Sequence, residues 1–333
     1  MKIKATIKTG FLGTTLSFSE DVSSPSKLKE KDSLLVKVQA GAINPIDYKL
    51  PRAASGSVVG QDFCGTVAEV HPDCDARFEV GDIVFGKAKG TLAEYTIASA
   101  KEIAQAPNGW KATDCAALTT AYWSALQSLR KGNILLEKSP AEKSVLVIGA
   151  SGGCGLAGVQ LCAGMGVSRI VAICSQKNDA FVRQHGATEV VNYANDSELQ
   201  SFFSENQGKF DCVYDTATCS GGGADYWKMS IGLLKKDFDD KIVGEYTTLN
   251  GSPSKWIRAM SGKQKEHETL IIMDANGKDL ELIVQLMEQT KAKPVTAIFS
   301  FDKEGIQKGF DLLKSRRAKG KIVFDILPVS RNV

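Results

Sequence analysis

The stretch Val145-Leu-Val-Ile-Gly149-Ala-Ser-Gly152-Gly153-Cys-Gly155 decides the fold of this chain. It begins as an apolar run typical of a buried strand and passes through closely spaced glycines into an apolar segment, 154–165, that predicts a helix. Glycines at such a turn permit close packing of strand and helix, and they also let the backbone approach a phosphate at the helix N-terminus. We therefore predict a dinucleotide site whose pyrophosphate contacts are Gly149, Ser151, Gly152, Gly153, Cys154 and Gly155.

The hydrophobic pattern of the sequence changes near residue 119, before this turn. The first 115 or so residues contain short alternating segments between glycines, which favour a β-rich domain. After residue 119, apolar strands alternate with helical patterns, and this predicts a parallel sheet covered on both faces. The expected strands are 34–40, 64–70, 83–86, 92–97, 144–149, 169–174, 189–192, 210–214, 241–246 and 321–326; the expected helices are 122–129, 154–165, 280–287 and 304–313.

Bulk composition is that of an ordinary globular protein. The chain has 333 residues, which suggests about two domains, and its net charge of +3 gives no reason to expect nucleic acid as a partner. No apolar run approaches the roughly 20 residues that span a bilayer, and Met1–Lys8 alternates like a strand rather than a secretory signal. We expect a cytoplasmic protein, with an organelle address possible only through an internal signal, and we expect its eight cysteines to be reduced.

The residues that follow the expected strand 169–174 bear on the choice of cofactor. An enzyme that prefers NAD usually has an acid there to bind the ribose hydroxyls, but this chain has Ser175-Gln-Lys177. Ser175 can donate a hydrogen bond, Lys177 brings a positive charge, and Tyr193 follows the next strand, so the pattern predicts NADPH. The alternative is that Lys177 is a solvated lysine at the start of a helix.

Several ordered motifs together resemble the zinc-independent, quinone oxidoreductase-like branch of the medium-chain dehydrogenases/reductases. The closest varieties in pattern are the chloroplast envelope quinone oxidoreductase homologues and the alkenal/enone reductases. The resemblance covers essentially the whole chain. It rests on Asn44-Pro-Ile-Asp47, Gly60-Gln-Asp62-Phe-Cys-Gly65-Thr-Val67, Val80-Gly-Asp-Ile-Val-Phe-Gly86, Leu92-Ala-Glu-Tyr95, Ala116-Ala-Leu-Thr-Thr-Ala-Tyr-Trp123, Gly149 to Gly155, and Ala318-Lys-Gly-Lys-Ile-Val323.

The resemblance implies an α/β fold in which a GroES-like β-rich catalytic domain, 1–118 completed by 275–333, is joined to a doubly wound Rossmann NADPH-binding domain, 119–274. In the family, Ser175, Lys177 and Tyr193 match positions that hold the NADPH phosphate, and Lys319 joins the candidate cofactor-binding residues. The family also implies a homodimer through edge strands of the cofactor domains. Residues 269–273 are the best candidate for that strand, and the alternative is an internal strand covered by its own chain.

The same comparison predicts a reaction without zinc. Zinc-dependent relatives use a catalytic cysteine and a Gly-His-Glu motif, whereas Asn44 and Gly60-Gln61-Asp62 stand here. No cysteine cluster lies between residues 85 and 116, and His71 with Cys74 has no further ligands beside it. We therefore expect no bound metal.

Without zinc, hydrogen-bond donors must polarise the substrate carbonyl. The candidates are Asn44, Tyr48 and Lys49, and the expected substrates are quinones or alkenes conjugated to a carbonyl. Several relatives have a tyrosine where Lys49 stands. Asn44 could instead cap a short helix with Pro45 at its first position, and Lys49 could simply be solvated.

Two other functions remain open. The chain could be an NADPH-binding structural or interaction protein with little turnover, because a fold does not fix activity. It could also be an enoyl-thioester reductase, since the basic residues Lys255, Arg258, Lys263 and Lys265 could contact an acidic carrier protein. Solvated lysines of a surface segment, 255–267, are the simpler interpretation.

Overall fold

The computed structural model describes residues 1–9, 15–25, 28–49, 56–74, 77–134, 140–219 and 225–327, and it divides into two compact units. The β-rich unit consists of 1–120, 275–284 and 293–333, and the parallel-sheet unit consists of 121–274 and 285–292. Helix α9 spans Gly277–Gln289; its residues up to 284 belong to the first unit, and those from 285 belong to the second.

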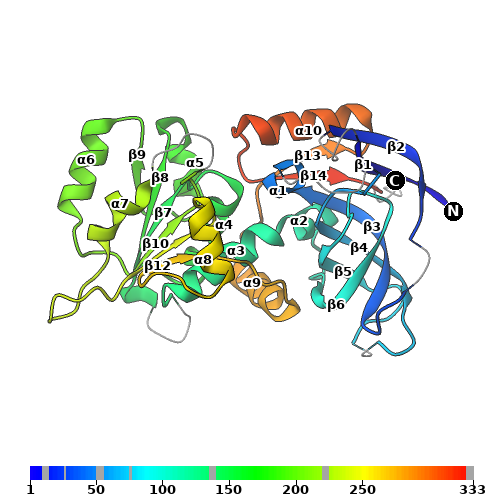
Figure 1. The fold of residues 1–333 in the computed structure, drawn as a ribbon, viewed down its shortest axis with the longest axis horizontal. Helices are drawn as coiled ribbons and strands as arrows, with labels where there is room; N and C mark the ends of the chain where they lie inside the picture. Colours follow the sequence, from blue (N-terminus) through cyan, green and yellow to red (C-terminus); the bar gives the residue numbers. More distant parts are fainter. Residues whose placement is uncertain are drawn as a thin grey trace. The chain divides into compact units, whose positions relative to one another are not determined.

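In the β-rich unit, within the described residues, the main sheet has the strand order β13-β14-β3-β4-β5-β6. β3 also pairs with β6, so the four antiparallel strands β3 to β6 close on themselves. The apolar core of this unit includes Val36, Phe63 and Phe324. A hairpin, β1-β2, stands beside this sheet, and α10 packs on β13 and β14 (Figure 1). The elements are β1 (Lys2–Thr9), β2 (Thr15–Ser23), β3 (Ser33–Ile43), α1 (Pro45–Lys49), β4 (Asp62–Val70), β5 (Ile83–Ala88), β6 (Tyr95–Gln105), α2 (Ala112–Ala117), β13 (Thr296–Ser300), α10 (Lys303–Ser315) and β14 (Lys321–Asp325).

The other unit contains an all-parallel sheet with the order β12-β11-β10-β7-β8-β9, and helices surround it (Figure 1). The chain moves outward in one direction from β7 to β9 and then in the other from β10 to β12, which is the doubly wound arrangement. The elements are α3 (Thr120–Lys131), η2 (Pro140–Glu142), β7 (Ser144–Ile148), α4 (Gly153–Gly164), β8 (Arg169–Cys174), η3 (Gln176–Asn178), α5 (Asp179–Gln184), β9 (Glu189–Asn192), α6 (Asp196–Glu205), β10 (Cys212–Asp215), α7 (Tyr226–Ser230), η4 (Ile231–Leu233), β11 (Glu245–Thr248), α8 (Pro253–Met260) and β12 (Glu268–Leu270).

Several expected strands begin later in the structure: the one expected at 92–97 begins at Tyr95, and the one expected at 210–214 begins at Cys212. The strand expected at 241–246 begins only at Glu245, because the Asp237 carboxylate accepts hydrogen bonds from the N–H groups of Asp239 and Lys241 and holds a turn there. The segment 255–267, expected as a polar and basic surface excursion, is largely exposed, and its first part is helical. Ser252 caps α8 by accepting a hydrogen bond from the Lys255 N–H, and Pro253 follows at the first helical position.

Candidate functional site

The glycine turn between β7 and α4 brings backbone N–H groups to the carboxyl end of the sheet. Gly149 has a φ of +79°, which a residue with a side chain adopts only with strain. A Cβ atom on Gly155 would lie 2.7 Å from the Gly149 carbonyl carbon, so only glycine fits at this crossing. Gly152, at the N-cap of α4, has no side chain to occupy the N–H groups of the first turn. The turn is therefore shaped to bind a phosphate on backbone donors.

The end of β8 is tied to this turn by a residue that the sequence reasoning missed. Asn178, at the end of η3 and 8% exposed, donates from Nδ2 to Ser151 Oγ at 2.9 Å and to Ser175 Oγ at 3.2 Å. The Asn178 side chain therefore connects Ser151, in the glycine turn, to Ser175, which follows β8. Its only sequence signal was its place in the polar run after β8.

Lys177 and Tyr193 lie on the same edge of the sheet. Lys177 is an exposed residue of η3, and Tyr193, 49% exposed, directly follows β9. The Tyr193 N–H donates to the Cys174 carbonyl at 3.2 Å, and Asn192 Oδ1 accepts from the Gln176 N–H at 3.3 Å, so the two strand ends are connected. Ser175, Lys177 and Tyr193 therefore come from the carboxyl ends of neighbouring strands.

The first acid after β8 is paired with an arginine of its own helix. Asp179 lies in the first turn of α5, and its carboxylate pairs with Arg183 one turn later at 2.7 Å. Burial and the nearby Asp179 carboxylate raise the pKa of the Cys174 thiol to about 11, so this group is neutral at physiological pH.

The carboxyl end of β10 holds a second turn beside the glycines. Asp215, fully buried, accepts hydrogen bonds from the N–H groups of Ala217 and Thr218 and from the hydroxyl of Tyr246. Burial, together with the Asp215 carboxylate, raises the pKa of Tyr246, so its hydroxyl stays protonated and donates to Asp215. Residues 216–218 are positioned in this way next to Gly149, where the Thr216 hydroxyl donates to the Ile148 carbonyl at 2.8 Å. The sequence reasoning did not single out this turn.

In the β-rich unit, Asn44 belongs to a buried polar cluster. Its Nδ2 donates to Asp62 Oδ2 at 2.7 Å, and its Oδ1 accepts from Lys321 Nζ at 2.7 Å. Lys321 also lies 3.0 Å from Asp62 and donates to the Ile43 carbonyl at 3.2 Å, while Thr120 donates to the other Asp62 oxygen at 2.5 Å. Asn44 precedes α1 as expected, but its side chain binds this cluster rather than capping the helix. The cap comes from Asp47, which accepts from the Asn44 N–H at 2.8 Å.

The other candidate donors follow on α1. Tyr48 is half-buried against the core of the β-rich unit, and Lys49 is exposed at the helix end. Lys319 is exposed in the same unit, two residues before the buried Lys321. Asn44, Tyr48 and Lys49, the candidate donors, thus lie together at the start and end of α1. Of the candidate cofactor-binding residues, all except Lys319 lie at the carboxyl end of the parallel sheet.

Within the described residues, no group of three His, Cys, Asp or Glu side chains is placed to hold a metal ion. None of the eight cysteines is in a disulfide bond; five of them are buried, and Cys219 is exposed. In the part of the chain that the structure describes, no helix is long and apolar enough to cross a membrane.

Comparison with known protein families identifies the chain as similar to dehydrogenases in two regions. The alcohol dehydrogenase GroES-like domain family matches residues 30–108, and the zinc-binding dehydrogenase family matches residues 185–324. The GroES-like domain and the parallel Rossmann-type sheet confirm the predicted α/β fold class. The second match does not include Asn44 or Gly60-Gln61-Asp62.

Curated relatives narrow the class to a family. A trans-enoyl reductase of Aspergillus terreus is 28% identical, covering 89% of this chain and 86% of the relative. A chloroplastic quinone-oxidoreductase homologue of Spinacia oleracea is 29% identical (89% and 90%), and a probable zinc-binding oxidoreductase, mitochondrial, of Arthroderma benhamiae is 30% identical (81% and 80%). The chain belongs to the quinone oxidoreductase-like family of the medium-chain dehydrogenases/reductases, and it is an oxidoreductase of the quinone oxidoreductase and enoyl reductase kind.

Solved structures share the fold over nearly the full length. The quinone oxidoreductase from Coxiella burnetii has a TM-score of 0.76 at 24% identity, covering 98% of this chain and 100% of that one. The quinone oxidoreductase from Thermus thermophilus, also determined in complex with NADPH, has a TM-score of 0.70 at 22% identity, with coverage of 97% and 100%.

Proposed function

We propose that this protein is an NADPH-dependent reductase that transfers hydride to a quinone or to an alkene conjugated to a carbonyl, without zinc. The observation that carries the choice of cofactor is the arrangement of Ser175, Lys177 and Tyr193 at neighbouring strand ends, with Asp179 paired to Arg183. A ribose phosphate needs a cation and hydroxyl donors, and NAD would need an acid instead. The NADPH-bound structure of the relative from Thermus thermophilus agrees with this choice.

The residues at the glycine turn would hold the pyrophosphate. Gly153, Cys154 and Gly155 form the first turn of α4, next to the cap residue Gly152, whose own N–H donates to the Gly149 carbonyl at 3.1 Å. Ser151 is oriented by Asn178. We also propose Lys319 as a cofactor contact, on the family resemblance alone. When bound, NADPH supplies the hydride.

Lys49 is our candidate for the group that acts on the substrate oxygen. As hydride reaches the β-carbon of an enone, negative charge develops on oxygen, and a positioned ammonium stabilises it and can then supply a proton. Asn44 already donates to Asp62 and accepts from Lys321, so its part is to fix the start of α1, with one amide hydrogen left for a ligand. Tyr48 is a third candidate donor.

Two arrangements support a reaction without zinc. The ammonium of Lys321 lies between Asn44 and Asp62, and its positive charge opposes a metal cation at that place. Both side chains are also already hydrogen-bonded. Elemental analysis of the purified protein should show no stoichiometric zinc, and activity should survive chelators. One tightly held zinc per chain would overturn this part of the proposal.

The decisive experiment follows NADPH oxidation with a quinone, a short enone and an enoyl thioester, run in parallel with NADH as the control cofactor. Turnover of a quinone or enone with NADPH supports the proposal. Tight NADPH binding without turnover of any acceptor would reject it and favour the structural role.

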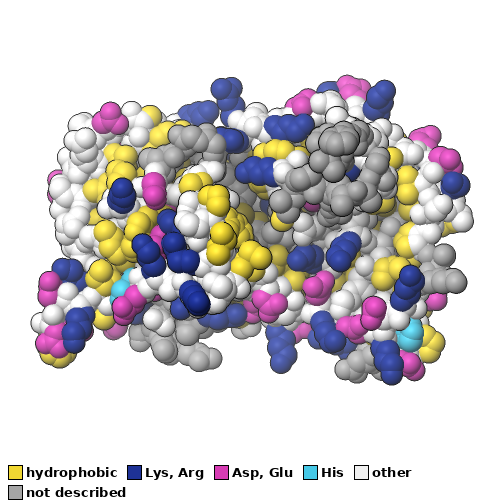
Figure 2. Space-filling model, viewed as in Figure 1, with side chains coloured by type: hydrophobic (Ala, Val, Ile, Leu, Met, Phe, Trp, Pro, Cys, Tyr) yellow, Lys and Arg dark blue, Asp and Glu magenta, His cyan; other side chains and the backbone are white. Residues whose placement is uncertain are grey.

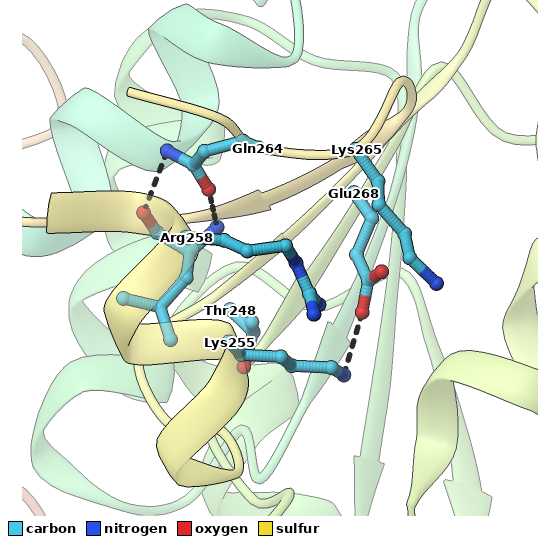
Figure 3. Close-up of a pocket in the computed structure, with 7 residues that line it drawn as sticks. Thr248, Lys255, Arg258, Gln264, Lys265 and Glu268 are labelled. Atoms are coloured by element: carbon cyan, nitrogen blue, oxygen red, sulfur yellow. Dashed lines mark hydrogen bonds and ion pairs between the residues drawn. The ribbon is translucent and has the colours of Figure 1, made fainter. Parts of the chain in front are cut away.

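A second candidate, an enoyl-thioester reductase, is favoured by the Aspergillus relative and by a basic surface beside α8. Figure 2 shows Lys and Arg side chains gathered there. Figure 3 shows Arg258 and Lys265 near the buried Glu268, whose carboxylate pairs with Lys255 at 2.6 Å. Since Lys255 is committed to Glu268, Arg258, Lys263 and Lys265 are the cations left for an acidic carrier. An Arg258→Glu/Lys265→Glu variant that loses turnover only with a carrier-bound thioester would establish this candidate.

We also propose a homodimer whose contact includes residues 269–273, and the cytoplasm as the compartment. β12 lies at the edge of the described parallel sheet, but it spans only Glu268–Leu270 and ends before residues 271–273. The Leu270 N–H and carbonyl are already hydrogen-bonded to the Gln264 side chain, so Leu270 itself would not pair with a partner strand. The names of two relatives place one in chloroplasts and the other in mitochondria.

A further inference from the structure

Asn178 lies between the two turns at which the proposed cofactor would place its phosphates. Ser151 belongs to the glycine turn, where we expect the pyrophosphate, and Ser175 follows β8, where we expect the ribose phosphate. The Asn178 amide donates one hydrogen bond to each serine, at 2.9 Å to Ser151 Oγ and at 3.2 Å to Ser175 Oγ. A single side chain therefore contacts both turns.

The direction of these hydrogen bonds determines what the two serines can bind. A serine hydroxyl has one hydrogen to donate and two lone pairs that accept. The hydroxyl oxygens of Ser151 and Ser175 accept from Asn178, and within the described residues neither hydroxyl donates to another protein group. Both hydroxyl hydrogens are thus left for a ligand. The ionised oxygens of a phosphate accept hydrogen bonds, so a phosphate is the ligand chemistry that these two donors match.

The side chain of Asn178 makes this contact instead of capping its own helix. Asn178 is the N-cap residue of α5, where an asparagine side chain usually accepts from a helix N–H, but here it forms no cap hydrogen bond. It is 8% exposed, and its Oδ1 has no hydrogen-bond partner among the described residues. A buried acceptor without a partner is unfavourable, so the placement of this side chain is not explained by the stability of α5.

Backbone hydrogen bonds fix the distance that the side chain spans. The N–H groups of Gly149 and Ala150 donate to the Ile173 carbonyl at 3.0 and 3.2 Å, which joins the glycine turn to the end of β8. The Asn178 N–H donates to the Ser175 carbonyl at 2.8 Å. The Asn178 amide is therefore held where it can orient both hydroxyls at once.

We propose that Asn178 is a positioning residue that sets the preference for NADPH over NADH, because it orients the Ser151 hydroxyl toward the pyrophosphate and the Ser175 hydroxyl toward the ribose phosphate. This inference rests on the proposed use of NADPH. NADH has the pyrophosphate but lacks the ribose phosphate, so it uses only one of the two oriented hydroxyls. Loss of the Asn178 amide therefore weakens NADPH more than NADH.

The test is fluorescence titration with NADPH and NADH, beside calorimetric titration with 2′,5′-ADP and 5′-AMP, which differ only in the ribose phosphate. Asn178→Ala should weaken NADPH and 2′,5′-ADP about tenfold, and NADH and 5′-AMP by about threefold at most, since hydrogen bonds to charged groups contribute more than neutral ones.

Asn206→Ala is the matched control. Asn206 is 7% exposed, and it donates to the Phe202 carbonyl at 2.9 Å and accepts from Arg169 at 2.8 Å. Arg169 begins β8, at the opposite end of the strand from Ser175. This variant should lower the thermal midpoint but leave the ratio of the NADPH and NADH dissociation constants unchanged.

Asn178→Asp has the same shape as the wild-type side chain and tests the direction of the hydrogen bonds. A carboxylate only accepts, so it would turn both serine hydroxyl hydrogens away from the phosphates. NADPH should weaken at least as much as in Asn178→Ala, while the thermal midpoint shows that the variant is folded. In the double variant Asn178→Ala/Ser175→Ala, the loss of NADPH affinity should be smaller than the sum of the two single losses, because Asn178 acts through Ser175.

The outcomes separate this inference from the choice of cofactor. A wild type that prefers NADH would overturn the choice of cofactor, and this inference with it. A wild type that prefers NADPH would leave that choice standing. This inference alone would then be overturned if Asn178→Ala weakened both cofactors equally, if Asn178→Asp bound NADPH as wild type does, if the losses in the double variant were additive, or if Asn206→Ala changed the ratio as Asn178→Ala does. Since binding is measured without an acceptor, these outcomes do not depend on which substrate is reduced.

Discussion

Lys321 on β14 forms a buried ion pair with Asp62 on β4, 259 residues earlier in the chain, with 3.0 Å between Nζ and the carboxylate. The two residues are 5% and 0% exposed. Through Asn44, the pair reaches the start of α1, which carries the candidate donors. The side chain of Lys321 on β14 therefore connects β4 to the start of α1, the helix that carries the candidate donors.

Replacing Lys321 by Met should destabilise the protein strongly. The Asp62 carboxylate would remain buried without its cation, and breaking a buried pair on one side costs about 3–5 kcal/mol. Urea denaturation would measure the loss in unfolding free energy. Lys278→Met, at an exposed lysine of α9, is the control and should change it by less than about 0.5 kcal/mol.

The double variant Lys321→Met/Asp62→Asn distinguishes the contribution of the ion pair to the unfolding free energy from that of side-chain packing. With no carboxylate left unpaired, it should be more stable than the sum of the two single changes predicts. Simple additivity would show that the pair is not coupled and that the losses come from altered packing.

Lys177→Ala should weaken NADPH and spare NADH. Removing the cation near the ribose phosphate should cost about 1–3 kcal/mol of NADPH binding, the range for hydrogen bonds to charged groups. Fluorescence titration with both cofactors measures this directly. Lys209→Ala is the control, since this exposed lysine precedes β10 at the opposite end of the strands. A wild-type preference for NADH would refute the assignment of Ser175, Lys177 and Tyr193.

Asp211 should make the stability of the parallel-sheet unit depend on pH. Burial alone would raise its pKa, but hydrogen bonds from Lys235 (2.6 Å), the Ser144 N–H (2.9 Å) and Lys143 (3.1 Å) hold the pKa below its usual value. A lowered pKa contributes stability that is complete above the unfolded-state pKa, about 3.9, and that is lost as pH falls through the folded-state value.

Unfolding of wild type and Asp211→Asn at several pH values provides the check. Wild type should exceed the variant by about 1–3 kcal/mol at pH 7. The difference should stay constant down to about pH 5 and shrink below the unfolded-state pKa. A difference that grows on acidification would contradict the cause assigned to the shift.

The proposed dimer can be tested at the edge of the sheet. Ile272, just beyond β12, is 51% exposed, and a charge there should oppose pairing with a second copy. Light scattering at micromolar concentration should show a dimer for wild type and a shift toward monomer for Ile272→Glu. Ile257→Glu, at an exposed position of α8, should leave the dimer intact. A monomeric wild type would exclude the dimer at that concentration.

Sequence reasoning was strongest where the chemistry is local. The turn from Gly149 to Gly155 combines a strand, a tight bend and a helix start within a few residues, and each of these has its own sequence signal. The Lys321–Asp62 pair has no such signal, because the two residues meet only through the antiparallel pairing of β14, β3 and β4. Asn178 was missed for a related reason: a polar residue after a strand usually faces water, and only the folded turn shows that it bridges Ser151 and Ser175.

The final prediction concerns the group that acts on the substrate oxygen. If Lys49 stabilises charge that develops during hydride transfer, Lys49→Ala should lower kcat for an enone about a hundredfold, as loss of one such donor does elsewhere. The NADPH dissociation constant should not change, because the interaction strengthens only in the transition state. Lys49→Arg keeps the positive charge and should recover part of the rate. The measurement is steady-state kinetics beside cofactor titration on the same preparations. A nearly active Lys49→Ala would instead show that water supplies the proton and that Lys49 is a solvated residue at the end of α1.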